Sequence, residues 1–328
     1  MTQAFFYLPS WQRLRDRIEE AAPQLECAFL DEDGRLLLNG REVSQDELDP
    51  KYFWIHGELF KSSWLKRYFE LMMHYPDATW LHTINTGLDI LPYLELLRKG
   101  MCITNNHSQA ISIAEYTLAN VLAHHQQIVA ARQLQADKTW KYRLFQEIYG
   151  EHWVIIGFGA IGREIASRAR AFGVKVTAVR RKQDTEGLAD AVLPLDAIHT
   201  ILPEADVVIL ACNANSETKG LVDSRFLAVM QEDSVLVNIA RGDLLDEVAL
   251  VEGLDENRPG YAILDVFQQE PLPGASPLWK HPKVAITSHC SNAGSGMRER
   301  SDELFLENLR RMVNDESLLN EVHEKDIL

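Results

Sequence analysis

Three residues whose side chains can carry chemistry follow three apolar runs in the second half of the chain. Arg241 follows the run VLVNIA, Glu270 lies just beyond LDVF, and His289 ends the run KVAITSH. A guanidinium binds oxyanions through paired hydrogen bonds, and an imidazole suits proton transfer because its pKa lies near neutral pH. A carboxylate can orient such an imidazole. If the runs are parallel strands, all three residues reach the sheet edge at which open α/β sheets bind ligands.

Each of these residues also has an ordinary interpretation. Arg241 could be a surface cation beside a helix, Glu270 a solvated loop acid, and His289 a histidine satisfied at a strand end. The order of the three, each after its own predicted strand, is what favours a common site.

A glycine-rich motif, GFGAIG at 157–162, has the spacing G-x-G-x-x-G. It closes the apolar run WVII and opens the helical pattern IGREIASRARAFG, which is the context that a dinucleotide-binding turn requires. Gly157 permits the tight turn, Gly159 lets the backbone approach a pyrophosphate, and Gly162 lets the helix pack on the strand. The alternative is a tight turn whose glycines serve geometry alone. The remaining residues of the motif predicted to contact the dinucleotide are Phe158, Ala160 and Ile161.

Three cations, Arg180, Arg181 and Lys182, follow the next apolar run, VTAV. Chains that bind NAD usually place an acid there, about twenty residues past the glycine turn, to hold the ribose hydroxyls. A 2′-phosphate would repel that acid and attract guanidinium groups. The cluster, in a protein with a net charge of −15, favours NADP(H). NAD(H) stays possible, because a shifted loop could bring Asp184 to the ribose.

Parallel strands that alternate with helices are predicted to position these groups. Six runs rich in β-branched residues lie between 153 and 289, and their continuous apolar character indicates strands buried on both faces. The first hundred residues show a second βα alternation, and we expect the amphipathic segment 296–314 to return to it. The prediction is an α/β fold of two domains: a Rossmann-type doubly wound parallel sheet over 106–291, and a smaller flavodoxin-like α/β substrate domain over 1–105 and 292–328.

Composition narrows the classes of partner. The net charge of −15 argues against nucleic acid and against anionic membrane surfaces. No apolar run reaches the length of a membrane span, and the N-terminus does not resemble a signal peptide. The four cysteines are scattered without metal-binding spacing, so we expect no metal site and a reduced, cytoplasmic protein.

Taken together, these motifs resemble the D-isomer-specific 2-hydroxyacid dehydrogenase family. The resemblance runs from TWLHTINTGLDIL through the glycine turn, ADVVILACNANSETKGLVD and VLVNIARGDLLDEVAL to LDVFQQEPLPGASPLW. It implies that His289 is the acid/base of the reaction, that Glu270 is its partner, and that Arg241 binds the carboxylate and carbonyl oxygen of a keto acid.

The resemblance implies further contacts. Backbone amides of Asn85, Thr86 and Gly87 would bind the substrate carboxylate, and Asp265 would receive the nicotinamide carboxamide. Other residues assigned to the dinucleotide site are Cys212, Asn213 and Ala240. The segment ADKTWKYRLF resembles the arm through which family members form homodimers. Ser288 stands where the family commonly has proline.

The activity implied is that of an NADPH-preferring reductase of small 2-keto acids, similar to glyoxylate/hydroxypyruvate reductases. One alternative is an NAD-dependent dehydrogenase of another D-2-hydroxy acid, such as phosphoglycerate. Another is a nucleotide-sensing protein like the corepressors that share this fold, which retain the same three residues. Glu270 argues against formate oxidation, because relatives with that activity have glutamine at its position.

Overall fold

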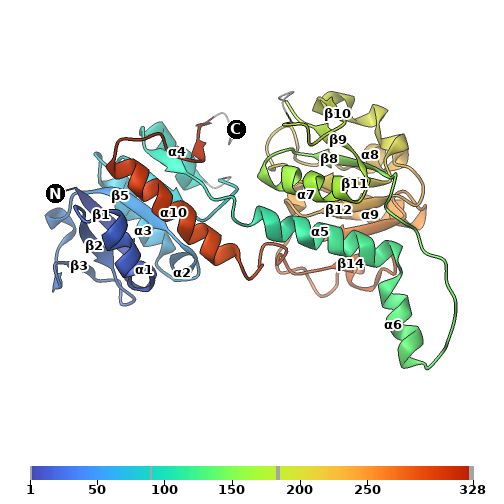
Figure 1. Ribbon diagram of the computed structural model, residues 1–328, viewed down its shortest axis with the longest axis horizontal. Helices are drawn as coiled ribbons and strands as arrows, with labels where there is room; N and C mark the ends of the chain where they lie inside the picture. Colours follow the sequence, from blue (N-terminus) through green and yellow to red (C-terminus); the bar gives the residue numbers. More distant parts are fainter. Residues whose placement is uncertain (1, 89–90, 182–184, 325–328) are drawn as a thin grey trace. The chain divides into compact units, whose positions relative to one another are not determined.

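The computed structural model describes residues 2–88, 91–181 and 185–324, and these fold into two compact units (Figure 1). Met1–Ser108 and Gly296–Leu328 together form one unit, here called the discontinuous unit. Gln109–Ser295 forms the other, the central unit. The boundaries predicted from the sequence lie a few residues earlier along the chain.

The central unit is built on a sheet of seven parallel strands. Its strands are β8 (His152–Ile156), β9 (Lys175–Val179), β10 (Ala191–Leu193), β11 (Val207–Leu210), β12 (Val235–Asn238), β13 (Tyr261–Leu264) and β14 (Val284–Ile286). They lie in the order β10-β9-β8-β11-β12-β13-β14. The direction of progression therefore reverses between β8 and β11, which is the point at which doubly wound sheets bind dinucleotides.

Helices cover both faces of this sheet, as the continuous apolar strands require. They are α5 (Ala110–His125), α7 (Ala160–Ala171), α8 (Ser224–Val229) and α9 (Glu247–Asp255). Helix α6 (Ile128–Ala136) has no buried residues and projects from the sheet (Figure 1). Short 3₁₀ segments span Leu195–Thr200, Leu202–Glu204, Gly242–Leu244 and Pro277–Lys280. Trp153 and Ile155 of β8 belong to the hydrophobic cluster that contains residues of α5 and α7, whereas Val154 and Ile156 belong to the cluster of α8 and α9.

The discontinuous unit has a second sheet, with five parallel strands at its centre. Its strands are β1 (Gln3–Tyr7), β2 (Glu26–Leu30), β3 (Leu36–Leu38), β4 (Arg41–Glu42), β5 (Pro50–Ile55), β6 (Trp80–Thr83), β7 (Cys102–Thr104) and β15 (Glu321–Val322). The parallel strands run β2-β1-β5-β6-β7, the flavodoxin order. Antiparallel β3 and β4 extend one edge, and antiparallel β15 extends the other.

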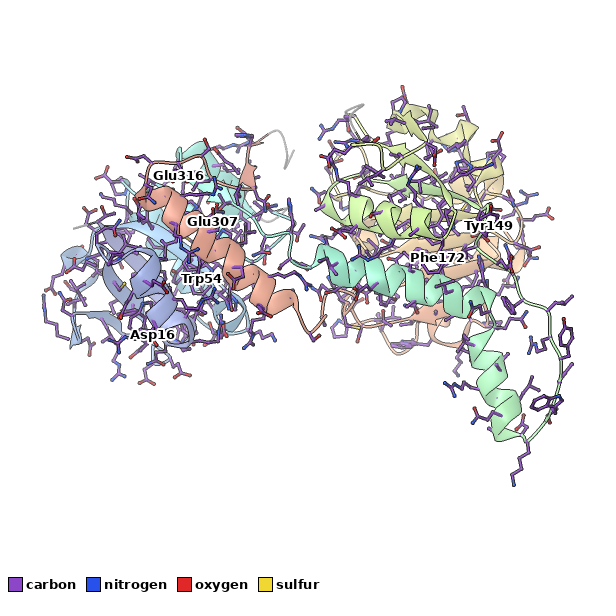
Figure 2. All side chains as sticks on the ribbon, viewed as in Figure 1. Asp16, Trp54, Tyr149, Phe172, Glu307 and Glu316 are labelled. Atoms are coloured by element: carbon purple, nitrogen blue, oxygen red, sulfur yellow. The ribbon has the colours of Figure 1, made fainter. Side chains whose placement is uncertain are left out.

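Helix α10 (Met297–Val313), in the C-terminal part of the chain, packs against this sheet. The other helices of the unit are α1 (Leu8–Ala21), α2 (Gly57–Phe60), α3 (Leu65–His74) and α4 (Leu91–Arg98), with a 3₁₀ turn at Gln45–Glu47. Phe305 of α10 stacks on Trp54 of β5, with ring centroids 4.0 Å apart. Figure 2 labels Trp54 beside the ribbon of α10. Both side chains are almost fully buried, so α10 is part of the core of this unit.

A buried polar cluster lies beside this aromatic stack. Nε2 of His56 is 3.2 Å from Oδ1 of Asp302, which also accepts a 2.9 Å hydrogen bond from Arg13 of α1. Nδ1 of His56 contacts Glu58, and Arg13 donates to that carboxylate as well. Glu58 also lies 3.7 Å from Nη1 of Arg298, and the two acids beside His56 favour the protonated form of its ring.

The structure departs from the sequence-based elements at three places. The sequence SIAE at 112–115 has the pattern of a capping box and predicts a helix that starts at Ser112, but α5 begins at Ala110, so Ser112 lies inside the helix. The sequence predicts that this helix continues to about Gln135, but it is broken at Gln127, whose φ of 54° places it in the left-handed region. The short strands β2, β3, β4, β10 and β15 were not predicted. Within the described residues, no helix is both long and apolar enough to span a membrane.

Candidate active site

The turn between β8 and α7 has the shape that its glycines predict. Gly157 has a φ of +94°, and a Cβ there would lie 2.5 Å from the backbone nitrogen of Cys212. A Cβ on Gly162 would lie 2.4 Å from the carbonyl oxygen of Gly157. Both positions therefore exclude any side chain, which keeps the turn tight and α7 close to the sheet.

Gly159 is different, because its hydrogen atoms face open space. It is the N-cap of α7, and a Cβ built on it would meet nothing within 4 Å. The first turn of the 12-residue helix contains no acid, so its free N–H groups and positive dipole end can receive an anion. A dinucleotide pyrophosphate fits this cradle. Phe158 is buried in the core, so only its backbone is available there.

Two of the three predicted cations can be placed. Arg180 follows β9 directly, is partly buried, and donates its backbone N–H to Leu193 at 2.9 Å. Arg181 is exposed beside it. Lys182 and Asp184 lie outside the described residues. The end of β9 is adjacent to the glycine turn, since β8 and β9 pair along their whole length, so both arginines follow the strand whose end receives the adenosine ribose in this fold.

Arg241, Glu270 and His289 follow β12, β13 and β14, which are consecutive neighbours in the sheet. Their backbones therefore reach the same edge. Arg241 donates from Nη1 to the Ala240 carbonyl at 2.8 Å, and its own carbonyl accepts from Asn238 Nδ2 at 2.9 Å. These bonds fix the residue at the point where the chain leaves β12.

Glu270 and His289 are in direct contact. Oε2 of Glu270 is 2.8 Å from Nδ1 of His289, and Oε1 accepts the Phe267 N–H at 3.0 Å. The carboxylate is thus anchored on its own loop while it orients the ring. With Nδ1 engaged, Nε2 is the ring atom placed to exchange a proton with a substrate. Both side chains are partly exposed, as a site open to a ligand requires.

Asp265 is fully buried and holds the loop that carries His289. Oδ1 accepts from the Thr287 hydroxyl at 2.5 Å and from the Cys290 N–H at 2.9 Å, and Oδ2 accepts the Ser291 N–H at 2.9 Å. Burial raises the pKa of Asp265, but the hydrogen bonds from Ser291 and Thr287 outweigh it, so the pKa is lowered and the side chain stays ionised. Its predicted contact with the nicotinamide carboxamide stays a prediction.

Side chains in the discontinuous unit fix the turn after β6. The Thr86 hydroxyl donates to the Asn106 carbonyl at 2.6 Å, and the Thr86 carbonyl accepts from Asn105 Nδ2 at 2.9 Å. Asn85 donates to the Tyr93 hydroxyl at 3.2 Å. These contacts hold the partly buried turn that continues to Gly87 in one shape at the carboxyl end of a parallel strand. Their role in substrate binding stays a prediction.

The remaining predicted contacts surround the same sheet edge. Cys212 and Asn213 follow β11, next to the glycine turn, and Ala240 is buried at the end of β12. The Asn213 carbonyl accepts the Thr218 hydroxyl at 2.7 Å, which orders this loop. Within the described ranges, no group of three or more His, Cys, Asp or Glu residues could hold a metal ion.

Sequence reasoning missed two residues near the histidine, Thr287 and Tyr116. The Tyr116 hydroxyl lies 2.7 Å from that of Thr287, although the two are 171 positions apart in the chain. No local pattern signals this contact, because it depends on α5 crossing the end of β14.

A parallel sheet with a glycine turn at its switch point and a histidine–carboxylate pair at the same edge defines a nicotinamide dinucleotide-dependent oxidoreductase. The family model described as "D-isomer specific 2-hydroxyacid dehydrogenase, NAD binding domain" matches residues 118–291. The chain belongs to the D-isomer-specific 2-hydroxyacid dehydrogenase family. It is thus an NAD(P)-dependent enzyme of the 2-hydroxyacid dehydrogenase and 2-keto acid reductase class.

Relatives of known name agree with this class. The chain is 31% identical to a glyoxylate reductase of Thermofilum pendens over 75% of each chain. It is also 31% identical to a D-3-phosphoglycerate dehydrogenase of Mycobacterium bovis, over 74% of this chain and 46% of that one. Among solved structures, an NADPH-dependent glyoxylate/hydroxypyruvate reductase of Sinorhizobium meliloti, crystallised with NADP and sulfate, has the same fold. Its TM-score is 0.76 at 20% identity, over the full length of both chains.

Proposed function

We propose that this enzyme is an NADPH-preferring reductase of small 2-keto acids of the glyoxylate or hydroxypyruvate type, which it converts to D-2-hydroxy acids. The observation that carries the proposal is the 2.8 Å contact between His289 and Glu270, at the sheet edge that also carries Arg241 and the glycine turn. Reduction of a keto acid needs both a proton donor and a cation for the carboxylate, and this edge has both.

Each residue has a distinct part in the proposed reaction. The bound dinucleotide supplies the hydride that reduces the carbonyl carbon. His289 donates the proton from Nε2 to the carbonyl oxygen, while Glu270 holds the ring through Nδ1 and stabilises its charged form. Arg241 binds the substrate carboxylate and carbonyl oxygen, which aligns the carbonyl carbon for attack. The backbone amides of the turn at 85–87 are assigned to the substrate carboxylate as well.

Arg180 and Arg181 support the preference for NADPH. Both follow β9, where a 2′-phosphate on the adenosine ribose needs positive charge and where an acid would favour NAD. A guanidinium grips a phosphate through two parallel hydrogen bonds, so two such groups distinguish the phosphorylated ribose strongly. The S. meliloti reductase, a structural neighbour, was crystallised with NADP.

We also propose that two copies of the chain form a homodimer through an arm of the central unit, residues 126–149. The arm consists of α6 and the extended segment after it, which project from the sheet (Figure 1). Trp140 is fully exposed, and four other large apolar side chains of this segment are exposed as well: Tyr142, Leu144, Phe145 and Tyr149. So much exposed apolar surface on one segment indicates an interface.

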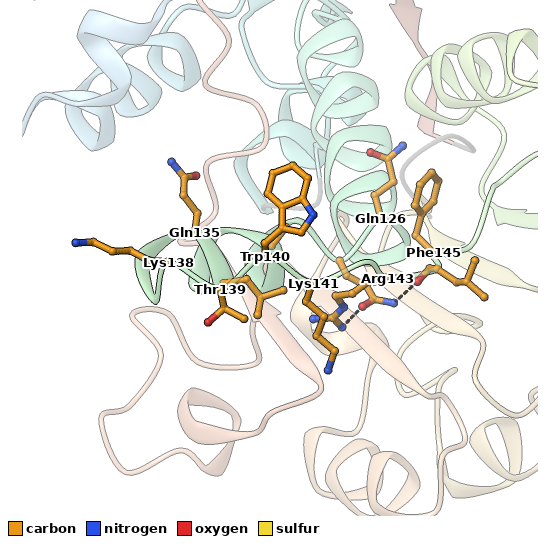
Figure 3. Close-up of a pocket in the computed structure, with 12 residues that line it drawn as sticks. Gln126, Gln135, Lys138, Thr139, Trp140, Lys141, Arg143 and Phe145 are labelled. Atoms are coloured by element: carbon orange, nitrogen blue, oxygen red, sulfur yellow. Dashed lines mark hydrogen bonds between the residues drawn. The ribbon is translucent and has the colours of Figure 1, made fainter.

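A groove in the arm is the proposed binding site for the second copy. Its volume is about 570 Å³, and Trp140, Lys141, Arg143 and Phe145 line it together with residues of α6 (Figure 3). Gln127 bridges its two sides, since its side chain contacts Arg143 and donates to the Leu144 carbonyl at 3.2 Å. The lining is largely apolar, which suits the equivalent exposed side chains of another copy.

Steady-state turnover tests the proposed function. Glyoxylate, hydroxypyruvate and pyruvate are each mixed with the enzyme and NADPH or NADH, and oxidation of the cofactor is followed by absorbance. We expect the highest kcat/KM with NADPH and glyoxylate or hydroxypyruvate. Cofactor binding without turnover of any keto acid would indicate a nucleotide sensor. Preferred turnover of phosphohydroxypyruvate with NADH would indicate the phosphoglycerate alternative.

A further inference from the structure

A chain of hydrogen bonds leads from helix α5 to the loop of His289. The Tyr116 hydroxyl is 2.7 Å from the Thr287 hydroxyl, which is 2.5 Å from Oδ1 of Asp265. Thr287 has a single hydroxyl proton, and the carboxylate can only accept. Thr287 therefore donates to Asp265, and Tyr116 must be the donor to Thr287. The chain has one direction, from Tyr116 through Thr287 to Asp265.

The loop at the end of this chain holds His289 in a strained conformation. His289 has a φ of +50°, in the left-handed region that residues with a side chain rarely adopt. Such a conformation persists only where its surroundings fix it, and residues of this kind gather at functional sites. Here Asp265 supplies the fixation, because its carboxylate binds the amides of Cys290 and Ser291 and its carbonyl accepts the His289 N–H at 2.7 Å.

Tyr116 is well suited to act as a permanent donor in this chain. It is partly buried on α5, and burial is the main cause that raises its pKa to about 12. The phenol therefore keeps its proton throughout the range in which the enzyme would be assayed. Asp265 stays ionised over the same range, so neither end of the chain changes its charge.

Both ends of the central unit's chain lie at the first turn of helix α5. Helix α5 begins at Ala110, directly after Gln109, where the unit starts. A Cβ on Gly294, which lies next to the unit's last residue, would be 2.0 Å from the Ser112 hydroxyl of α5. The segment that follows the His289 loop is thus packed against the first turn of α5, and the Tyr116 contact lies one turn further along the helix.

We propose that Tyr116 is a positioning residue for the acid/base histidine: through Thr287 and Asp265 it fixes the loop of His289 on helix α5. The inference rests on the proposed role of His289 and adds to it a residue outside the sheet edge. Tyr116 does not touch the substrate in this scheme. It keeps the imidazole where Glu270 can orient it for proton transfer from Nε2 to the substrate.

Removal of the Tyr116 hydroxyl tests the proposal. We expect Tyr116→Phe to lower kcat about 3- to 10-fold, the effect of one lost hydrogen bond, because the histidine is held in its reactive position for less of the time. KM for the keto acid and Kd for NADPH should change less than about 2-fold, because Tyr116 touches neither ligand in this scheme and Asp265 keeps its hydrogen bonds from Thr287, Cys290 and Ser291. Tyr261→Phe is the matched control. Tyr261 begins β13, whereas Asp265 follows the other end of that strand, so this change should leave kcat unchanged.

A double-mutant cycle separates a connected chain from two independent effects. Thr287→Val removes the middle hydroxyl, so adding Tyr116→Phe to it should cause little further loss of kcat. Thr287→Ser keeps the hydroxyl and should retain most of the activity. If the two losses simply multiply, or if Thr287→Ser is as impaired as Thr287→Val, the chain does not operate and the proposal is wrong.

Hydrogen–deuterium exchange reports on the loop without any reference to activity. The amides of Cys290 and Ser291 should exchange faster in Tyr116→Phe than in the unmodified protein, while the strands of the sheet keep their protection. Unchanged exchange together with unchanged kcat in Tyr116→Phe would overturn the inference about Tyr116 and would leave the proposed function untouched. If His289→Gln keeps normal turnover, the proposed function fails, and the exchange rates still decide whether Tyr116 orders the loop.

Discussion

Nδ1 of His289 lies 2.8 Å from Oε2 of Glu270, and the two residues follow adjacent parallel strands. The second oxygen of that carboxylate accepts the Phe267 N–H, so the pair is held from the protein side. The orientation of the imidazole therefore exists before any substrate binds, and the proposed proton transfer needs no reorganisation of the ring.

The first prediction concerns this histidine. His289→Gln should lower kcat by at least about 100-fold, because an amide cannot donate a proton to the carbonyl oxygen. Binding of NADPH, followed by its fluorescence, should change less than about 2-fold, because the glycine turn is intact. Near-normal turnover in this variant would reject the acid/base assignment.

The second prediction concerns cofactor preference. Replacement of Arg180 and Arg181 by alanine should raise KM for NADPH by about 10-fold or more, since charge-assisted hydrogen bonds contribute about 1.5–3 kcal/mol each. KM for NADH should hardly change. Arg168→Ala is the matched control, because Arg168 pairs with Glu164 on α7. Equal effects on the two cofactors would refute a phosphate-binding role.

The third prediction concerns the arm. Trp140→Ser combined with Leu144→Ser should convert a dimer to a monomer, as measured by light scattering after gel filtration, because it removes two large exposed apolar side chains from the proposed interface. Val248→Ser changes an exposed apolar residue on α9, outside the arm, and should leave the mass unchanged. A monomeric unmodified protein at micromolar concentration would contradict the dimer.

The fourth prediction concerns pH. Burial alone would lower the pKa of His56, but the carboxylates of Asp302 and Glu58 outweigh it and raise the pKa above its ordinary value. The folded protein thus binds this proton more tightly than the unfolded chain does. The resulting stabilisation is complete below about pH 6.5 and is lost as pH rises through the raised pKa.

Unfolding by urea at several pH values checks this sign. The free energy of unfolding should fall as pH rises above about 6.5, and the fall should be smaller in His56→Gln. His74→Gln is the control, because His74 is an exposed histidine of the same unit. The same slope in His56→Gln as in the unmodified protein would show that His56 does not carry the effect.

The strands that position the site could be predicted because each is a continuous apolar run. A strand that is buried on both faces has apolar side chains along its whole length, whichever strands lie beside it. The order of these runs in the chain then places Arg241, Glu270 and His289 at one edge of the sheet. The glycine turn could be predicted as well, because its steric demands are local. In both cases the signal lies within a few residues of the feature.

Other features depend on contacts between distant residues. Strands β3 and β4 are short and lie at a sheet edge, so they lack the apolar signature of the central strands. The partner of Thr287 lies on a helix 171 positions earlier, and the left-handed conformation of His289 is set by Asp265 and not by its own type. Such features follow from the assembled fold, and a single sequence does not display them.

The discontinuous unit is completed by a segment that is synthesised after the whole central unit. Until α10 emerges from the ribosome, Trp54 lacks the stacking partner Phe305, and Arg13 lacks the acid Asp302. The central unit, being continuous, can finish its sheet first, while the nascent residues 1–108 wait with an apolar face uncovered. Loss of α10 alone would therefore leave an aggregation-prone fragment attached to a well-folded nucleotide-binding unit.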